Sequence, residues 1–391
     1  MRVGIVGCGT AGAAAAILLA RAGCEVTVLE RVEKPGAVGA GIILQPTGQA
    51  VLARLGLLDE IAAKGARLDR LFLRTREGRT LVDLHYARCD RSWFGLGIHR
   101  GALFEALYRT ACAEVRVHTG VAIEALRHEG EVVYAGDHGP FDLVVLADGA
   151  SSTLRDAKVS LYPWGALWFV AKTEAFAGEL YQVAERARKL YGILPTGQGL
   201  ASLFWSLPAD GLDAWRADFA GWKRDVLAMD PRAAPVLDQI AGPEAVTFAR
   251  YRDVRMGRWH DGRVVTIGDA AHATSPQLGQ GANLALVDAL VLAACVTAAP
   301  VPEALALYQR QRAEHLRHYQ RMTRVLTPFF QSHSSLLGWL RDWTFPIANA
   351  LPPLNKHMVR TMAGVSLGMV ARPLALSSLP ATRVAIADKS A

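Results

Sequence analysis

Short apolar runs and one run of small residues alternate along the first thirty residues of the chain. Residues 3–6 are apolar and lead into a glycine-rich turn at 7–12, and an alanine-rich segment of helix-favouring composition follows. A second apolar run over 25–29 ends at Glu30. This order predicts a strand, a glycine turn, a helix and a second strand, as in a βαβ nucleotide-binding unit.

The glycines of this turn have separate predicted roles. Gly7 allows the tight turn, Gly9 lets the backbone approach a pyrophosphate, and Gly12 lets the helix pack closely on the strand. The helix N-terminus offers unpaired N–H groups and a partial positive charge to phosphates. Glu30 is placed to bind a ribose hydroxyl. The pattern therefore predicts a dinucleotide site, for NAD or for FAD, with a merely tight strand–helix turn as the alternative.

Beyond residue 30 the chain changes between helical and strand-like patterns. The glycine-rich passage 36–46 is expected either to lie against a flat ligand or to form a flexible loop. Two apolar runs flank the turn 76–79 and predict an antiparallel hairpin over 71–84, which breaks the βα alternation and indicates a second domain. Helices are predicted at 47–58 and 102–112, and strands at 115–118, 132–134, 141–147 and 263–267.

Aromatic residues are frequent from residue 158 to about residue 251, where short strand-like runs mix with helical ones such as 212–227. We expect this region and the hairpin to form a substrate domain on a mixed or antiparallel sheet. The expected fold is α/β, with a discontinuous Rossmann-like domain, this inserted domain and a helical C-terminal region. The Rossmann-like domain takes residues 1–68, 99–157 and 256–325, the substrate domain 69–98 and 158–255, and the C-terminal cover and frayed tail 326–391.

Composition narrows the class of protein. The chain has 391 residues, of which 51% are hydrophobic and 20% are charged, and its net charge is +7. It is long enough for two or three domains, and nothing clusters like a nucleic-acid site. Five scattered cysteines without CxxC spacing predict free thiols of a reducing, cytoplasmic compartment, with no disulfide framework and no metal site.

The same sequence predicts no membrane-spanning segment. The best candidate, 285–299, contains Asp288 and stops at Pro300. The first twenty residues superficially resemble a signal peptide, but the glycine turn and the strand after it explain them better, so we expect no cleavage.

Two further motifs stand at the ends of predicted strands. Residues 144–152 read VVLADGASS, with Arg155 close behind, and residues 267–289 read IGDAAHATSPQLGQGANLALVDA. Together with the first turn, they resemble the single-component, FAD-containing aromatic monooxygenases of the para-hydroxybenzoate hydroxylase type, from residue 1 to about residue 325. The strand-end GD followed by a PxxGxGxN loop is the most specific of the three motifs, whereas the resemblance is thin across the substrate region.

The resemblance implies which residues hold FAD. Asp269 would bind the ribityl chain, and the loop 276–283 would lie along the isoalloxazine ring, where a helix N-terminus stabilises negative charge on the reduced flavin. Asp148 and Arg155 would serve FAD and the passing nicotinamide cofactor. The alternative is strand-end capping for Asp148 and Asp269, and a surface salt bridge for Arg100 and Arg155. The full set implied for FAD is Gly7, Gly9, Ala11, Gly12, Glu30, Arg31, Gly41, Arg100, Val121, Asp148, Arg155, Asp269, Gly279, Gly281, Ala282 and Asn283.

One passage departs from the best-studied members of that family. They have an arginine, which helps to hold FAD and the moving flavin, where this chain has Gly39-Ala40-Gly41-Ile42. Related subgroups share the glycine and alanine pattern. FAD binding is therefore still expected, but details of flavin movement are not carried over.

The resemblance implies hydroxylation of an aromatic or fused-ring substrate. Because the chain has one convincing dinucleotide fingerprint, NAD(P)H is expected to bind transiently and to reduce FAD. O2 would then form a flavin C4a-hydroperoxide that transfers one oxygen to the ring. Alternatives are a flavin halogenase, an isoprenoid-type flavin reductase and, outside the enzymes, a non-catalytic flavin-binding protein. The halogenase motif WxWxIP is missing, since the nearest string, 204–208, lacks its spacing.

The catalytic base is left open by these patterns. His272 is a candidate, although a buried structural histidine hydrogen-bonded near the acid is the favoured interpretation. Tyr191, Tyr251 and His99 are other conceivable pocket groups. The loop around Pro276 and Leu278 is expected to lie near the substrate.

The last part of the chain begins with a long helix that has one strongly basic side. An aromatic stretch at 326–345 follows it. We expect the helix to pack on the FAD domain and the rest to cover the substrate pocket. The alternative is a docking face for a membrane surface, a carrier protein or a partner. The residues assigned to the basic side are Arg310, Arg312, His315, Arg317, His318, Arg321 and Arg324.

Overall fold

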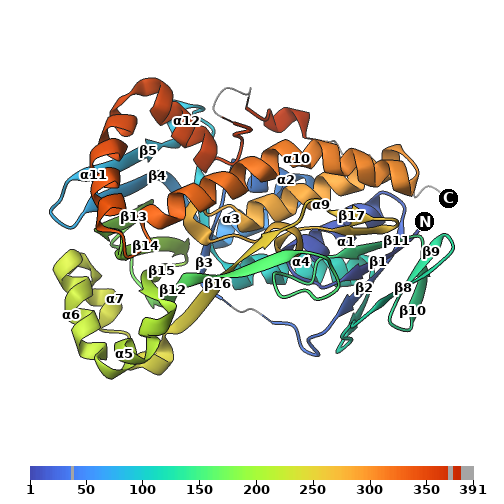
Figure 1. The fold of residues 1–391 in the computed structure, drawn as a ribbon, viewed down its shortest axis with the longest axis horizontal. Helices are drawn as coiled ribbons and strands as arrows, with labels where there is room; N and C mark the ends of the chain where they lie inside the picture. The colour runs from blue at the N-terminus through green and yellow to red at the C-terminus, as the bar shows by residue number, and fades with distance from the viewer. Residues whose placement is uncertain (37–38, 369–372, 380–391) are drawn as a thin grey trace.

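The computed structural model describes residues 1–36, 39–368 and 373–379 (Figure 1). Its first part is built on a six-stranded sheet in the order β17-β18-β11-β1-β2-β7. All pairs in this sheet are parallel except β17 with β18, so the predicted βαβ unit is confirmed. The strands are β1 (Arg2–Val6), β2 (Glu25–Glu30), β7 (Arg116–Thr119), β11 (Leu143–Leu146), β17 (His260–Asp261) and β18 (Val264–Thr266).

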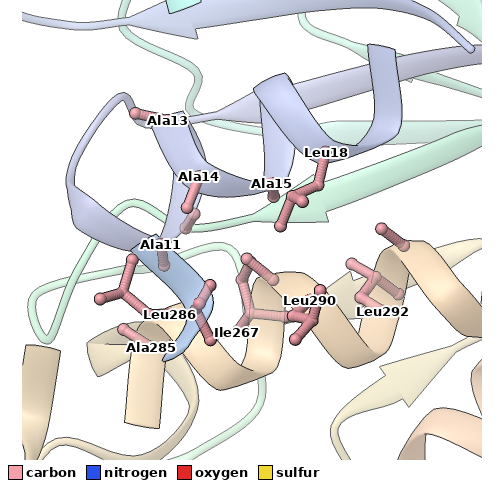
Figure 2. Packing of buried hydrophobic residues seen from close by; sticks show 14 of the residues in the cluster. Ala11, Ala13, Ala14, Ala15, Leu18, Ile267, Ala285, Leu286, Leu290 and Leu292 are labelled. Atoms are coloured by element: carbon pink, nitrogen blue, oxygen red, sulfur yellow. The ribbon is translucent and has the colours of Figure 1, made fainter. Parts of the chain in front are cut away.

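Helices that share one hydrophobic core with this sheet include α1 (Thr10–Arg21), α4 (Arg100–Glu114), α9 (Gly281–Ala298) and α10 (Val301–Leu326). The first part of helix α1 is made of small residues, and the helix is buried from Ala11 to Leu19. Figure 2 shows its small side chains facing the larger side chains of α9, including Leu286 and Leu290. A second core cluster joins the sheet to a three-stranded sheet of β8 (Leu126–Glu129), β9 (Val132–Ala135) and β10 (His138–Phe141).

Helix α9 departs from the prediction that no run is long enough to span a membrane. Its length and composition alone would allow it to cross a membrane, because its 18 residues have a mean hydropathy of 1.8. However, 67% of that window is buried inside the protein, where α9 packs against α1, α10 and α2 (Pro46–Leu55). Helix α9 is therefore the central core helix of the nucleotide-binding part.

The second large sheet has nine strands in the order β16-β12-β15-β14-β13-β4-β6-β3, with β5 beside β4. Strands β13 and β4 run parallel and the other neighbours antiparallel, so the predicted mixed sheet and hairpin are confirmed. The strands are β3 (Gly41–Leu44), β4 (Ala66–Thr75), β5 (Thr80–His85), β6 (Gly95–His99), β12 (Lys158–Lys172), β13 (Gly178–Glu185), β14 (Lys189–Gly197), β15 (Leu200–Pro208) and β16 (Thr247–Arg255).

Strand β3 lies within the glycine-rich passage 36–46, so this part of the passage is a strand and not a flexible loop. Residues 37 and 38 lie outside the described residues. Since β3 belongs to the nine-stranded sheet, the passage joins the two large sheets, and the domain boundaries proposed from the sequence stay a prediction. Helices α2 (Pro46–Leu55) and α3 (Leu58–Lys64) follow β3.

Helices α5 (Leu212–Ala217), α6 (Phe219–Met229) and α7 (Ala234–Leu237) pack together on the nine-stranded sheet. The helical run predicted over 212–227 is interrupted at Asp218. The side chain of Asp218 accepts a hydrogen bond from the Gly221 N–H and caps α6. Two helices are therefore found where one was predicted.

The C-terminal helices α11 (Ser335–Ala350) and α12 (Pro352–Met362) pack beside the β4–β5 hairpin (Figure 1). The segment after α12 then returns to α10, where the Ser366 N–H donates a hydrogen bond of 3.2 Å to the Tyr319 hydroxyl. Arg54 donates to the carbonyls of Leu376 and Leu379. Residues 376–379 of the expected tail are therefore held against α2, and the rest of that tail lies outside the described residues.

Candidate flavin site

The carboxyl ends of four parallel strands bring the three sequence motifs to one edge of the six-stranded sheet. Val6 is paired with Leu29 and with Leu146, and Leu146 is paired with Thr266. The glycine turn, Glu30, the Asp148 loop and the Asp269 turn follow these strand ends. In open α/β sheets, ligands bind in the crevice outside such carboxyl ends.

The glycines of the first turn divide into two groups. Gly7 has φ of +95°, and a Cβ there would lie 2.6 Å from the Ala147 carbonyl oxygen. A Cβ on Gly12 would lie 2.0 Å from the Gly7 carbonyl oxygen. A Cβ on Gly9 would have no neighbour within 4 Å among the described residues. Gly7 and Gly12 are therefore required by the fold, whereas Gly9 leaves free space at the start of α1.

The N-terminus of α1 is available to an anion. It has no side-chain cap and no acid in its first turn. Glu30 accepts hydrogen bonds from the Cys8 N–H (2.7 Å) and the Val32 N–H (2.9 Å), and the Val121 N–H binds the Glu30 carbonyl. Glu30 thus fixes the glycine turn against β2, and its oxygens keep lone pairs for a ribose hydroxyl. Its neighbour Arg31 is exposed.

Asp148 has one carboxylate oxygen, Oδ1, that is buried without a hydrogen-bond partner in the described structure. Burial raises the pKa of this carboxyl. A buried, unsatisfied acceptor is costly, so it marks a place where a ligand donor fits.

Arg155 connects the second motif to the third. Its guanidinium donates to the carbonyls of Ala150, Ser152 and Ala270. Burial lowers the pKa of Arg155. Ala270 lies in α8 (Asp269–His272), so Arg155 positions the Asp269 turn and is not the surface salt bridge considered as the alternative.

The Asp269 turn contacts the first motif. Gly268 has φ of +61°, and a Cβ there would lie 2.7 Å from the Ala11 Cβ. Asp269 is exposed, and a Cβ on Gly281 would lie 3.7 Å from its Oδ1. The carboxylate therefore lies between the start of α1 and the start of α9.

Asn283 fixes the loop 276–283 against β3. Its side chain is fully buried, and Oδ1 accepts from the Gln45 N–H (2.8 Å). Its Nδ2 donates to the carbonyls of Ile43 (3.0 Å) and Gly279 (3.1 Å). With the side chain used in this way, a flavin contact from Asn283 would come from its backbone. The uncapped α9 N-terminus begins here, at Gly281 and the half-buried Ala282.

The start of the same loop is more accessible. Pro276 is exposed, and the half-buried Leu278 packs against the main core.

Strand β3 lies between this loop and the nine-stranded sheet. A Cβ on Gly41 would lie 2.7 Å from the Thr196 side chain and 2.8 Å from that of Ser202. Arg100 is exposed, its N–H binds the Ala40 carbonyl, and its side chain lies against Gly39. The predicted flavin site and the substrate sheet are therefore in direct contact at Gly41.

His272 is part of a buried charge network. Asp288 is fully buried and accepts hydrogen bonds from His272 Nε2 (2.5 Å), Arg312 Nε (2.7 Å) and the Gly268 N–H (3.0 Å). Burial alone would raise the pKa of Asp288, but His272 and Arg312 hold it below its usual range. Because its Nε2 is committed to Asp288, the structure favours the structural interpretation of His272.

The prediction that α10 has one strongly basic side is wrong. Arg312 and His315 are buried, and Arg324 pairs with Asp253. Arg312 donates to His315 Nδ1 (2.7 Å), so His315 Nε2 carries the proton that binds the Gly364 carbonyl (2.7 Å). His318 is half-buried, and Arg310, Arg317 and Arg321 are exposed.

Acid is expected to destabilise the fold through His315. Burial lowers the pKa of His315 to about 3, and the Arg312 charge adds to the effect. In the unfolded chain His315 has the ordinary histidine pKa of about 6.5. Below that pH the unfolded chain therefore binds a proton at His315 that the folded chain does not bind. This group should have no effect above pH 7 and should lower the free energy of unfolding by about 2 kcal/mol between pH 6.5 and 5.

Urea unfolding at pH 7 and pH 5 measures this effect. His315→Gln should lose that part of the pH dependence, and His128→Gln, at an exposed strand position, should keep it. Equal pH dependence in the two variants would contradict the assignment.

The other candidate bases differ in their surroundings. His99 Nδ1 accepts from the Gly101 N–H and caps α4. Tyr191 is fully buried in the cluster under α5–α7. Tyr251 is half-buried, and its hydroxyl has no hydrogen-bond partner among the described residues. Burial raises the pKa of Tyr251, which keeps it a neutral donor.

The sequence analysis did not single out an aromatic pair on the nine-stranded sheet. Trp168 and Phe204 are cross-strand partners with ring centroids 5.5 Å apart, and both are half-buried. Gly192 makes room for the Phe204 ring, since a Cβ there would lie 2.2 Å from it. Phe204 and Ile43 of β3 pack on the same small cluster. The high aromatic content of 158–251 was the available signal, but it did not distinguish this face from ordinary core.

These features fit a dinucleotide that carries a flat ring. The free N-terminus of α1 and Glu30 suit the adenosine diphosphate half, whereas Asp269 and the loop 276–283 suit the ring half. The orphaned Asp148 oxygen lies at the same sheet edge. The fold and the site together define a flavin-dinucleotide-binding α/β protein.

Comparison with known proteins agrees with this assignment. The FAD binding domain family matches residues 1–323. A probable 2-heptyl-3-hydroxy-4(1H)-quinolone synthase from Rhodococcus erythropolis is 30% identical over 327 residues, covering 78% of this chain and 82% of the relative. The 3-amino-4-hydroxybenzoate 2-monooxygenase of Streptomyces cremeus is 30% identical over 356 residues, covering 84% and 88%.

A solved structure has a fold similar to that of this chain. Klebsiella pneumoniae HpxO, complexed with FAD and uric acid, has a TM-score of 0.81 and 23% identity, covering 94% of this chain and 98% of that one.

The chain therefore belongs to the FAD binding domain family. It is an FAD-dependent monooxygenase of the aromatic hydroxylase type, as the sequence motifs predicted.

Proposed function

We propose that this enzyme uses NAD(P)H and O2 to hydroxylate a nitrogen-bearing aromatic ring that already carries an oxygen substituent. The names of both 30%-identical relatives describe such rings, a hydroxyquinolone and an aminohydroxybenzoate. Oxygen and nitrogen substituents make a ring electron-rich. FAD, when bound, supplies the redox and oxygen-transfer chemistry.

One observation carries the substrate side of this proposal: the Trp168–Phe204 pair packs near β3, which Asn283 ties to the loop 276–283. A planar substrate stacked on this pair would be held beside the loop. Tyr251 offers a neutral hydroxyl as a hydrogen-bond donor. The protein residues thus orient the ring and exclude water around it.

The site residues implied by the sequence resemblance are part of the same proposal. Glu30, Val121 and Gly9 would hold the adenosine diphosphate half. Asp269, with the backbone at Gly279 and Gly281 to Asn283, would hold the flavin half. The free thiols of the five described cysteines support the proposed cytoplasmic location.

A spectrum and a turnover assay test the function. The purified protein should be yellow with FAD bands, and a hydroxylated aminobenzoate or quinolone should accelerate its NAD(P)H oxidation with formation of a product heavier by one oxygen. Phe204→Leu should raise KM about tenfold with little change in flavin content, because it removes ring stacking worth about 1 kcal/mol or more. Trp215→Phe, in the core under α5–α7, is the matched control.

Two results would contradict the proposal. A colourless protein that does not take up FAD would exclude the cofactor. NAD(P)H oxidation that yields only peroxide across all such rings would exclude the substrate class.

A further inference from the structure

Helix α11 lies at the outer edge of the molecule (Figure 1). It exposes a row of large apolar side chains. Trp339 is 58% exposed, Trp343 52% and Ile347 58%. Their spacing of three and four residues places them on one helix face, together with Leu336 and Leu340, and Leu351 follows at the helix end. The two tryptophan rings lie 6.1 Å apart. We call Leu336, Trp339, Leu340, Trp343, Ile347 and Leu351 the apolar row.

The helix presents this face because its rotation is fixed from the other side. Arg341 is fully buried, and its guanidinium donates to the carbonyls of Arg186 (2.7 Å) and Phe329 (3.1 Å) and to Asp342. Gly338 lies so close to the sheet that a Cβ would be 2.7 Å from the Ala187 nitrogen. The helix therefore buries its one arginine and exposes its tryptophans, which is the reverse of the arrangement expected in water.

One cation contacts the apolar row, and two more lie on the neighbouring helix. Arg79, in the β4–β5 turn, lies 5.3 Å from the centre of the Trp343 ring. Helix α12, which packs against α11, exposes Lys356 and Arg360 and contains no acid. None of these three cations has an ion pair within the described part of the chain, and Glu77 is the one acid of the β4–β5 turn.

We propose that the apolar row docks on an anionic lipid surface. Tryptophan has an apolar body with a polar N–H and is the residue preferred where one end is apolar and the other is wet. The cations would meet the anionic headgroups while the row enters the boundary with the acyl chains. A contact between two copies through this face would instead bring the cations of one copy toward those of the other, which is unfavourable.

Co-sedimentation of the full-length holoprotein with vesicles tests this docking. The protein should bind vesicles containing phosphatidylglycerol and should bind pure phosphatidylcholine vesicles at least tenfold more weakly. The bound fraction should fall with added salt. Trp339→Ser combined with Trp343→Ser should weaken binding at least tenfold. Val159→Ser, at a 44%-exposed apolar position on β12, should leave it unchanged.

Flavin content and NAD(P)H oxidation with a water-soluble substrate should be the same in the double variant, so this test is independent of the proposed substrate class. The proposal is overturned if the protein stays in the supernatant with anionic vesicles, or if Val159→Ser loses as much binding as the double variant. It is also overturned if sedimentation velocity shows a dimer that the double variant dissolves, because the apolar row is then a contact between copies.

Discussion

Asp288→Asn should destabilise the protein by about 3–5 kcal/mol, because it leaves the Arg312 charge buried without its partner. Asp288 accepts from His272, Arg312 and the Gly268 N–H, and both Asp288 and Arg312 are almost completely buried. Thermal unfolding should show the effect as a Tm lowered by roughly 10 °C. FAD should also be retained less well, because the Gly268–Asp269 turn loses an anchor.

A surface pair is the matched control for this substitution. Glu60 pairs with Arg109 and Lys64 on the outside of α3, and Glu60→Gln should cost about 1 kcal/mol or less. Combining Asp288→Asn with Arg312→Met should recover part of the lost stability, since no charge is then left unpaired. An Asp288→Asn protein as stable as the wild type would show that the network does not stabilise the fold.

Gly9→Ala and Gly12→Ala should fail in different ways. A Cβ on Gly9 meets no described atom within 4 Å, and its φ of −73° suits alanine, so the variant should fold normally. Its Cβ would occupy the space needed by the pyrophosphate, and FAD affinity should fall about 100-fold. A Cβ on Gly12 would lie 2.0 Å from the Gly7 carbonyl oxygen, so this variant should lose both FAD and stability.

Titration of FAD into the apoprotein and thermal unfolding separate the two effects. Gly36→Ala, at an exposed position where a Cβ also meets no described atom, should change neither property. A Gly9→Ala protein that binds FAD like the wild type would place the pyrophosphate elsewhere. A Gly12→Ala protein of unchanged stability would contradict the predicted clash.

The meeting of the candidate flavin-site motifs at one sheet edge could be predicted to a large extent, because each motif is local in sequence. The turn 7–12 with Glu30 lies within one βαβ unit, and the Gly268-Asp269 turn directly precedes the loop 276–283. In each motif the strand end and the residues that follow are consecutive, so spacing along the chain carries the geometry. The parallel sheet then brings the separate strand ends to one edge.

The buried charge network could not be recognised in the same way. Arg312 and His315 were assigned to a basic surface because their side chains are cationic. They occupy core positions of α10, at helical spacing with Leu305, Tyr308, Leu316 and Tyr319. A charge in the apolar helix α9 requires a partner, and that partner is 24 residues away. The periodicity of α10 was the signal that could have identified the buried face.

By itself, then, the sequence determined the FAD-binding βαβ unit, the two strand-end acids and the α/β fold class, since these depend on short-range patterns of apolar residues and glycine. Only the tertiary structure decided that His272 binds Asp288 and that Asn283 uses its side chain to fix β3. It also decided that α11 buries Arg341 and exposes its tryptophans. These features depend on which distant residues share a buried space, and packing between helices and sheets sets that.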